Sequence, residues 1–263
     1  MFEAELHNKL PELNALEDYL TSCFFGALKC LPPEEGLIPV LRKAYNYQTN
    51  KSFQPPEGID QVKYFFWPKF SGGEPDLVLI LTAGRVKYLL CVEVKYYSPK
   101  SSIGEADQLK RYYDGLLKKR AEFTSENIAN FKGKFLGLIY LTQYEAYDEI
   151  QESTKAIDKT NVLNPGLFHL CWEDTFRAVE ELAKSKTQNK IANQIYSDLL
   201  QLLEHKNLQY FKEFSELPEE LNAQELKRDP VFLFASFSGF SDLPAGLDLA
   251  QNTRFLEGKY EKN

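Results

Sequence analysis

The chain has 263 residues, of which 43% are hydrophobic and 26% are charged, a composition typical of a globular domain rather than of a disordered segment. No stretch approaches the about 18 to 20 apolar residues of a membrane span, and residues 1–7 lack the basic and apolar regions of a signal peptide. We therefore expect a cytoplasmic protein that binds no membrane, with one large domain and an extension.

The formal net charge of −7 is unevenly distributed along the chain. Residues 85–134 carry eleven Lys and Arg against six Asp and Glu, whereas the remainder is acidic. A basic segment of this kind is typical either of a surface that binds a polyanion or of a solvated helix face. Both interpretations stay open at this point.

The first part of the chain predicts two helices and a strand. A stripe of Leu and Phe at helical spacing predicts a helix over residues 10–28, and Glu17 lies in line with that stripe. A short helix is predicted over residues 37–44, before a loop rich in Asn, Gln and Pro. Residues 61–68 are aromatic and β-favouring, which predicts a strand. A carboxylate on an apolar face needs a partner, so Glu17 should reach either a polar site or water.

Two apolar runs, residues 77–81 and 88–92, predict a hairpin with its turn near residue 84. Antiparallel pairing about that turn places Asp76 opposite the end of the second run. Asp76 and Glu93 are therefore expected to meet across the ladder.

Glu93 and Lys95 should project to the same face of the sheet, because side chains alternate along a strand. Two carboxylates and an ammonium then converge. Carboxylate oxygens bind Mg²⁺, which lowers the pKa of a bound water so that it becomes a nucleophile. A nearby lysine can position that water or stabilise developing charge on phosphorus. The alternative interpretation is a buried salt bridge.

Pro75-Asp76, an apolar strand, a turn and Glu93-Val94-Lys95 resemble the signature of the PD-(D/E)xK nuclease superfamily. The resemblance covers about residues 10–183. It implies a restriction-endonuclease-like α/β fold, in which a mixed central sheet is flanked by helices and the core order is helix, three strands, helix, strand.

The same resemblance implies Mg²⁺-dependent hydrolysis of phosphodiester bonds, with Mn²⁺ as a substitute. Asp76, Glu93 and the Val94 carbonyl would hold the metal. Lys95 would orient or activate the attacking water. Many members of the superfamily donate a glutamate from the first core helix, and Glu17 resembles that residue.

A helix with a clear apolar face is predicted over residues 105–117, after the Glu93 strand. Gln108 and Tyr112 are four residues apart and share one face of it, near the end of the strand. Their arrangement resembles the Q-x-x-x-Y motif of RecB-like members, which implies a role in touching the phosphate or ordering Lys95. Alternatively, Tyr112 is a core residue and Gln108 a surface amide.

Basic residues beside this motif are candidates for contact with the nucleic-acid backbone, without reading its sequence. They are Lys100, Lys110, Arg111, Lys118 and Lys119. The resemblance implies DNA as the substrate, and RNA is not excluded.

The remaining elements extend this core. They are a strand at 135–142 parallel to its neighbour across a helical crossover, a helix at 144–157, a strand at 167–172, a helix at 175–183, a helix containing Ile191 to Leu203, and an aromatic tail from Leu208. We expect a nuclease-like domain over residues 1–185 and a mainly helical extension over residues 186–263 packed on it.

The cysteines and histidines are scattered along the chain. Cys23, Cys30, Cys91 and Cys171 lack the close C-x-x-C pairing of a zinc site and are expected to be reduced core residues. The three histidines are isolated, which favours structural roles over a zinc hydrolase or a Ser-His-Asp triad.

The expected function is therefore that of a metal-dependent nuclease, with a role in restriction or anti-phage defence suggested by the resemblance. Its partners would be DNA and a second copy of the chain or a larger defence or repair assembly. The acidic net charge and the aromatic tail favour an alternative, a non-catalytic nucleic-acid or protein-binding module that retains the nuclease scaffold. A small-molecule hydrolase lacks a pocket signature. Endo or exo cleavage is left open.

Overall fold

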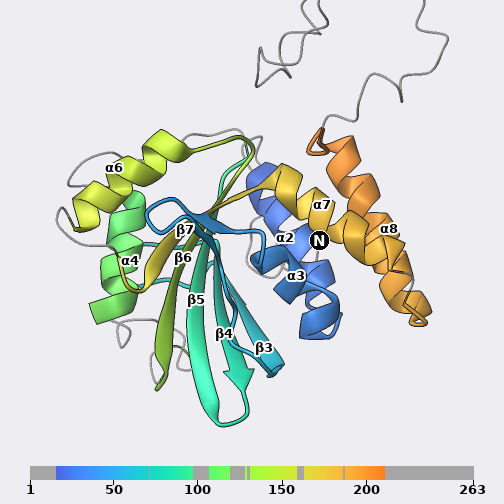
Figure 1. The fold of residues 1–263 in the computed structure, drawn as a ribbon, viewed down its shortest axis with the longest axis horizontal. Helices are drawn as coiled ribbons and strands as arrows, with labels where there is room; N and C mark the ends of the chain where they lie inside the picture. The colour runs from blue at the N-terminus through green and yellow to red at the C-terminus, as the bar shows by residue number, and fades with distance from the viewer. Residues whose placement is uncertain are drawn as a thin grey trace, which may run out of the picture. The chain divides into compact units, whose positions relative to one another are not determined.

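The computed structural model describes residues 16–70, 72–96, 107–118, 128, 131–158, 163–185 and 187–210. They form an α/β structure in which a seven-stranded mixed sheet is flanked by helices (Figure 1). No helix in this part of the chain is both long and apolar enough to cross a membrane.

The strands follow the order β2-β1-β7-β6-β5-β4-β3 across the sheet. Their bounds are Tyr45–Asn46 (β1), Lys51–Ser52 (β2), Ile59–Phe66 (β3), Leu77–Ala83 (β4), Val86–Val94 (β5), Lys134–Thr142 (β6) and Gly166–Cys171 (β7). Neighbours among β3, β4 and β5 are antiparallel, whereas β5, β6 and β7 run parallel. The predicted parallel crossover into β6 is confirmed.

The helices form a layer on each face of the sheet. Their bounds are Leu16–Leu28 (α2), Pro33–Glu35 (the 3-10 helix η1), Leu37–Leu41 (α3), Gln108–Lys118 (α4), Tyr147–Ile157 (α6), Trp172–Lys184 (α7) and Lys190–His205 (α8). Helices α4 and α6 pack on one face, while α2, α3, α7 and α8 pack on the other (Figure 1).

The central strands are buried on both faces, because each faces a helical layer. Leu79 and Leu90 point into the core beneath α2 and α7, whereas Val78 and Cys91 point into the core beneath α4 and α6. The alternation follows from the two-residue period of a strand, and it places Glu93 on the α4 side and Val94 on the α2 side.

Short strands and element ends differ from the sequence expectations. Strands β1 and β2 lie in the segment predicted as a loop; each has two residues, too few for a detectable pattern. Strand β3 is shifted to residues 59–66, and Trp67, with a φ of 46°, follows it. Helix α7 begins at Trp172, a residue predicted to end the preceding strand.

Tyr210 is the last residue that the structure describes. It is also the last residue of the compact unit that contains the sheet. Helix α8, the first element of the predicted extension, packs against α7 and α2. Residues 211–263, including the aromatic tail, lie outside the described residues.

Gly137 is required by the packing of β6 against β7. A bulge in β6 leaves this residue with a φ of 136°, and an added Cβ would lie 2.2 Å from the Gly166 carbonyl oxygen. We expect Gly137→Ala to lower the free energy of unfolding by at least about 2 kcal/mol, from backbone strain and overpacking together. Urea denaturation measures this loss.

Gly84→Ala is the matched control for that variant. Gly84 lies in the β4–β5 turn with a φ of 57°, but an added Cβ would meet nothing within 4 Å. Its cost should be limited to the left-handed conformation, about 1 to 2 kcal/mol. Equal losses in the two variants would contradict the steric argument.

Candidate active site

The ends of β4 and β5 bring two acidic residues together. Asp76 directly precedes β4 and Glu93 lies one residue before the end of β5, and only 7% and 2% of their surfaces are exposed. Leu77 pairs with Val92, so the next pair along the antiparallel ladder is Asp76 with Glu93. The two carboxyl groups thus meet, in a register one residue from the predicted one.

Lys95 follows β5 and joins the same cluster. Its Nζ lies 2.9 Å from Glu93 Oε1 and donates a hydrogen bond of 3.1 Å to Glu17 Oε1. Glu17 comes from the first turn of α2, and its other oxygen accepts a hydrogen bond of 2.9 Å from the Tyr96 backbone N–H. Glu17 therefore reaches a polar site, where its partner is Lys95, and its role as a metal ligand stays a prediction.

Gln108 and Tyr112 approach the carboxylates from α4. Gln108 Nε2 donates to Glu93 Oε1 at 2.6 Å and to the Tyr112 hydroxyl at 3.1 Å, and that hydroxyl donates to the Glu74 carbonyl oxygen at 3.1 Å. Both side chains are buried, so Gln108 is not a surface amide. The predicted helix face contacts the strand ends, and it fixes the Glu93 carboxylate.

Burial and like charge act together on the acids. Burial raises the pKa of Asp76, and repulsion from Glu93 raises it further, against the lowering effects of Lys95 and the Val94 N–H. Burial likewise raises the pKa of Glu93. Burial alone would lower the pKa of Lys95, but its three acidic neighbours outweigh that effect and raise it. The lysine is thus protonated at neutral pH, in a site with an excess of acidic groups.

The oxygen atoms of the cluster fit a hard divalent cation. Glu93 Oε1 is bound by Lys95 and Gln108, whereas Glu93 Oε2 is buried and, among the described residues, only a protonated Asp76 carboxyl group could donate to it. Asp76 Oδ2 accepts a 2.8 Å hydrogen bond from the Val94 N–H, which orients the carboxylate. An unsatisfied buried carboxylate oxygen beside a second carboxylate is the donor set that Mg²⁺ prefers.

The basic residues predicted to contact nucleic acid are described only in part. Lys110 forms an ion pair with Asp114 one turn along α4, and Arg111 Nε donates to the Gly72 carbonyl oxygen at 3.4 Å. Lys100, Lys119 and the side chain of Lys118 lie outside the described residues. The role of this group stays a prediction.

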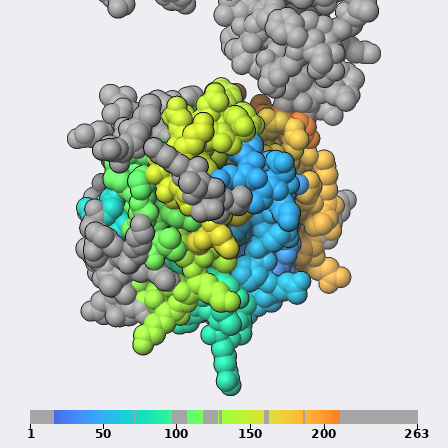
Figure 2. Space-filling model, turned by 60° about the vertical axis from the view of Figure 1, so that its left-hand side comes forward, coloured from blue at the N-terminus to red at the C-terminus, as the bar shows by residue number. Residues whose placement is uncertain are grey.

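A second basic feature lies at the opposite end of β4 and β5, near the turn that protrudes at the bottom of the molecule (Figure 2). It is a cavity of about 350 Å³. Its described lining residues include no acid; they are Gln61, Lys63, Ile80, Thr82, Arg85, Lys87, Phe131 and Lys132. Glu93 lies an even number of positions after Lys87 on β5, so the cavity and the acidic cluster share one face of the sheet.

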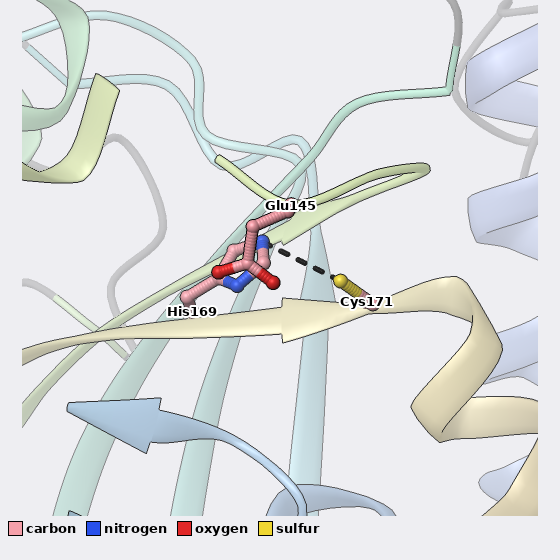
Figure 3. Close-up of side chains that lie close together, drawn as sticks. All are labelled: Glu145, His169 and Cys171. Carbon is pink, nitrogen blue, oxygen red and sulfur yellow. Dashed lines mark hydrogen bonds between the residues drawn. The ribbon is translucent and has the colours of Figure 1, made fainter. Parts of the chain in front are cut away.

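The parallel strands carry further polar residues that sequence reasoning missed. Glu93, Tyr140 and His169 are register partners on β5, β6 and β7, so they form one row on the α4 side. His169 lies beside Cys171 and Glu145 (Figure 3). In the sequence, two polar residues lie two positions apart at the end of each of these strands. This pattern predicts a shared row only when the register of the strands is known.

Comparisons of the chain with protein-family models, with curated proteins and with solved structures find no match. The chemistry of the site must therefore be argued from its own residues.

Proposed function

We propose that the chain is a metal-dependent nuclease of the PD-(D/E)xK type that hydrolyses phosphodiester bonds, with DNA as the expected substrate. The observation that carries this proposal is the convergence of Asp76, Glu93 and Lys95 in one buried cluster, with Lys95 Nζ 2.9 Å from Glu93. A salt bridge alone does not account for the second carboxylate, whose repulsion with Glu93 must be relieved either by a proton or by a further cation.

The order of the elements supports the same assignment. Helix α2, strands β3, β4 and β5, helix α4 and strand β6 occur in the order of the restriction-endonuclease-like core, with η1, α3, β1 and β2 between α2 and β3. Helix α2 contributes Glu17, and α4 contributes Gln108 and Tyr112, to a site at the ends of the strands. A likeness of fold does not fix the reaction, so the proposal depends on the site residues.

Asp76 and Glu93 would hold Mg²⁺ or Mn²⁺, with the Val94 carbonyl as a further candidate ligand. When bound, the metal would lower the pKa of a coordinated water and polarise the phosphate. Lys95 stays protonated, so we infer that it donates to the attacking water or to the phosphate oxygens and does not act as a base. Gln108 and Glu17 keep the lysine and Glu93 in place.

Cleavage assays on the full chain test the proposal. Plasmid, linear duplex, single-stranded DNA and RNA are incubated with Mg²⁺, Mn²⁺ or a chelator, which also separates endo from exo cleavage. We expect metal-dependent cleavage of at least one substrate by the wild-type chain. Binding without cleavage under every metal condition would instead support a non-catalytic binding module. Restriction or anti-phage defence is the setting that we propose for the activity.

We expect the basic cavity to bind the backbone of the substrate. It lies about six residues along β5 from Glu93, or roughly 20 Å at the rise of a strand, which matches about six nucleotides of duplex DNA. We expect Lys63→Ala combined with Lys87→Ala to weaken DNA binding and to lower the slope of log K against log salt concentration by about 2.

The matched control combines Lys43→Ala with Lys184→Ala. Lys43 forms an ion pair with Glu181, and Lys184 forms one with Glu180. Both glutamates belong to helix α7, in the helical layer on the opposite face of the sheet. Binding isotherms at several KCl concentrations measure both variants. A salt slope that is unchanged by the cavity variant, or equally reduced by the control, would remove the cavity from the substrate path.

A further inference from the structure

Three groups with metal-ligand chemistry meet at the carboxyl end of β7 (Figure 3). His169 and Cys171 are two residues apart on the strand and therefore share one face, and Glu145 comes from the segment between β6 and α6. One ligand atom from each lies within 4.8 Å of the other two. The His169 Nε2 to Cys171 Sγ distance is 3.8 Å.

The hydrogen-bond chain through His169 is one proton short. The Tyr47 hydroxyl contacts both Glu145 Oε1 and His169 Nδ1, and the Thr142 hydroxyl contacts both His169 Nε2, at 2.8 Å, and the Tyr144 carbonyl oxygen, at 2.5 Å. These four contacts need four protons. Tyr47, Thr142 and a neutral imidazole supply one proton each.

A cation on His169 Nε2, either a second ring proton or a metal ion, removes this shortage. With a metal ion, the contact between Thr142 and Nε2 is no longer a hydrogen bond. The imidazole then donates from Nδ1 to Tyr47, Tyr47 donates to Glu145, and Thr142 donates to the Tyr144 carbonyl oxygen. A metal-bound histidine characteristically donates its other ring N–H to a partner that fixes its orientation. The Tyr47 hydroxyl, which also contacts Glu145, is that partner for His169 Nδ1.

The charge around the thiol favours a cation. Three acidic residues, Asp174, Glu145 and Glu173, lie close enough to Cys171 to act on its charge. A metal bound there would take the place of the thiol proton.

We propose that Glu145, His169 and Cys171 form a binding site for a borderline-soft divalent cation of the Zn²⁺ type. Zn–N bonds of about 2.1 Å and a Zn–S bond of about 2.3 Å imply an N···S separation of roughly 3.5 Å in a tetrahedral site. The observed 3.8 Å is close to that value. Glu145 is exposed, so its second carboxylate oxygen can approach the ion while Oε1 keeps its contact with the Tyr47 hydroxyl.

This site is separate from the proposed catalytic centre. Glu93 and His169 are two strands apart in the same row, about 10 Å at the spacing of strands in a sheet. Two-metal hydrolysis needs ions about 3.5 to 4 Å apart, so a cation on Cys171 would take no part in the cleavage of DNA. It would instead tie the segment before α6 to the end of β7.

Cobalt binding by the full chain tests the proposal. Co²⁺ is added to chelator-treated protein, and the absorption from charge transfer between thiolate and Co²⁺ is followed by spectroscopy. We expect a saturable band at one Co²⁺ per chain that Zn²⁺ removes. Cys171→Ser should lose the band, and Glu145→Gln, a variant at an exposed position, should weaken binding at least about tenfold.

Two control variants show whether the band comes from this site. Cys30→Ser, at an exposed cysteine, should keep the band. Asp76→Asn should also keep it, because Asp76 belongs to the catalytic cluster, so failure of the nuclease proposal leaves this test intact. A wild-type chain without the band would indicate a protonated His169 in place of the metal and overturn the proposal. A band of equal intensity in Cys171→Ser would do the same.

Discussion

Lys95→Ala is expected to lower kcat for metal-dependent DNA cleavage by about 10²- to 10³-fold, the usual cost of losing one preorganised donor to a transition state. Lys95 is held by Glu93 and Glu17 and remains protonated, so its loss removes positive charge where the phosphate would gain negative charge. Single-turnover cleavage at saturating Mg²⁺ measures the change in the chemical step.

Lys95→Ala is also expected to lower the stability of the fold, because it removes one partner of a buried ion pair. A thermal melt of Lys95→Ala in Mg²⁺ shows whether the chain is folded during the assay. Lys43→Ala, which breaks a surface ion pair with Glu181, should leave kcat unchanged. Cleavage by Lys95→Ala at the wild-type rate would rule out the proposed role and would indicate a contaminating nuclease.

Mg²⁺ is expected to stabilise the wild-type chain by about 2.7 kcal/mol when its concentration is 100 times the Kd, a rise in Tm of about 5 to 10 °C. Asp76→Asn should abolish this rise, because it removes an ionised ligand while the amide oxygen can still accept the Val94 N–H. In the absence of metal, the same variant should melt at or above the wild-type temperature, since it relieves repulsion with Glu93.

The pH dependence of that stabilisation follows from the direction of the two pKa shifts. The pKa values of Asp76 and Glu93 are raised in the folded chain, so the folded state binds more protons than the unfolded state between the ordinary and the raised pKa. The metal-free chain should therefore lose stability as pH rises through this window. Mg²⁺ displaces those protons, so its stabilising effect should increase with pH. Melting curves from pH 5 to 8, with and without Mg²⁺, test both slopes, and a metal effect independent of pH would place the cation elsewhere.

The sequence was informative wherever a site residue is fixed by local periodicity. The two-residue period of β5 predicted that Glu93 and Lys95 share a face, and the hairpin turn predicted that Asp76 lies beside them. The four-residue spacing on α4 predicted that Gln108 and Tyr112 act together. Each of these relations depends on a short stretch of chain.

Relations that depend on tertiary alignment were not predictable. The grouping of Glu145, His169 and Cys171 requires the parallel register of β6 and β7, which is set across helix α6 and the loops around it. The residues therefore looked isolated in the sequence. Strands β1 and β2 pair at the edge of the sheet with two residues each, and a pattern of that length cannot be told from a loop.

Lys95 is held between groups that belong to opposite layers of the fold. Glu17 belongs to α2, in the layer on one side of the sheet, whereas Gln108 belongs to α4, on the other side, and binds the same Glu93 oxygen as the lysine. The full set of contacts around the ammonium therefore exists only when both layers are packed on the sheet. For the nuclease that we propose, an incompletely folded chain would lack the lysine position on which cleavage depends.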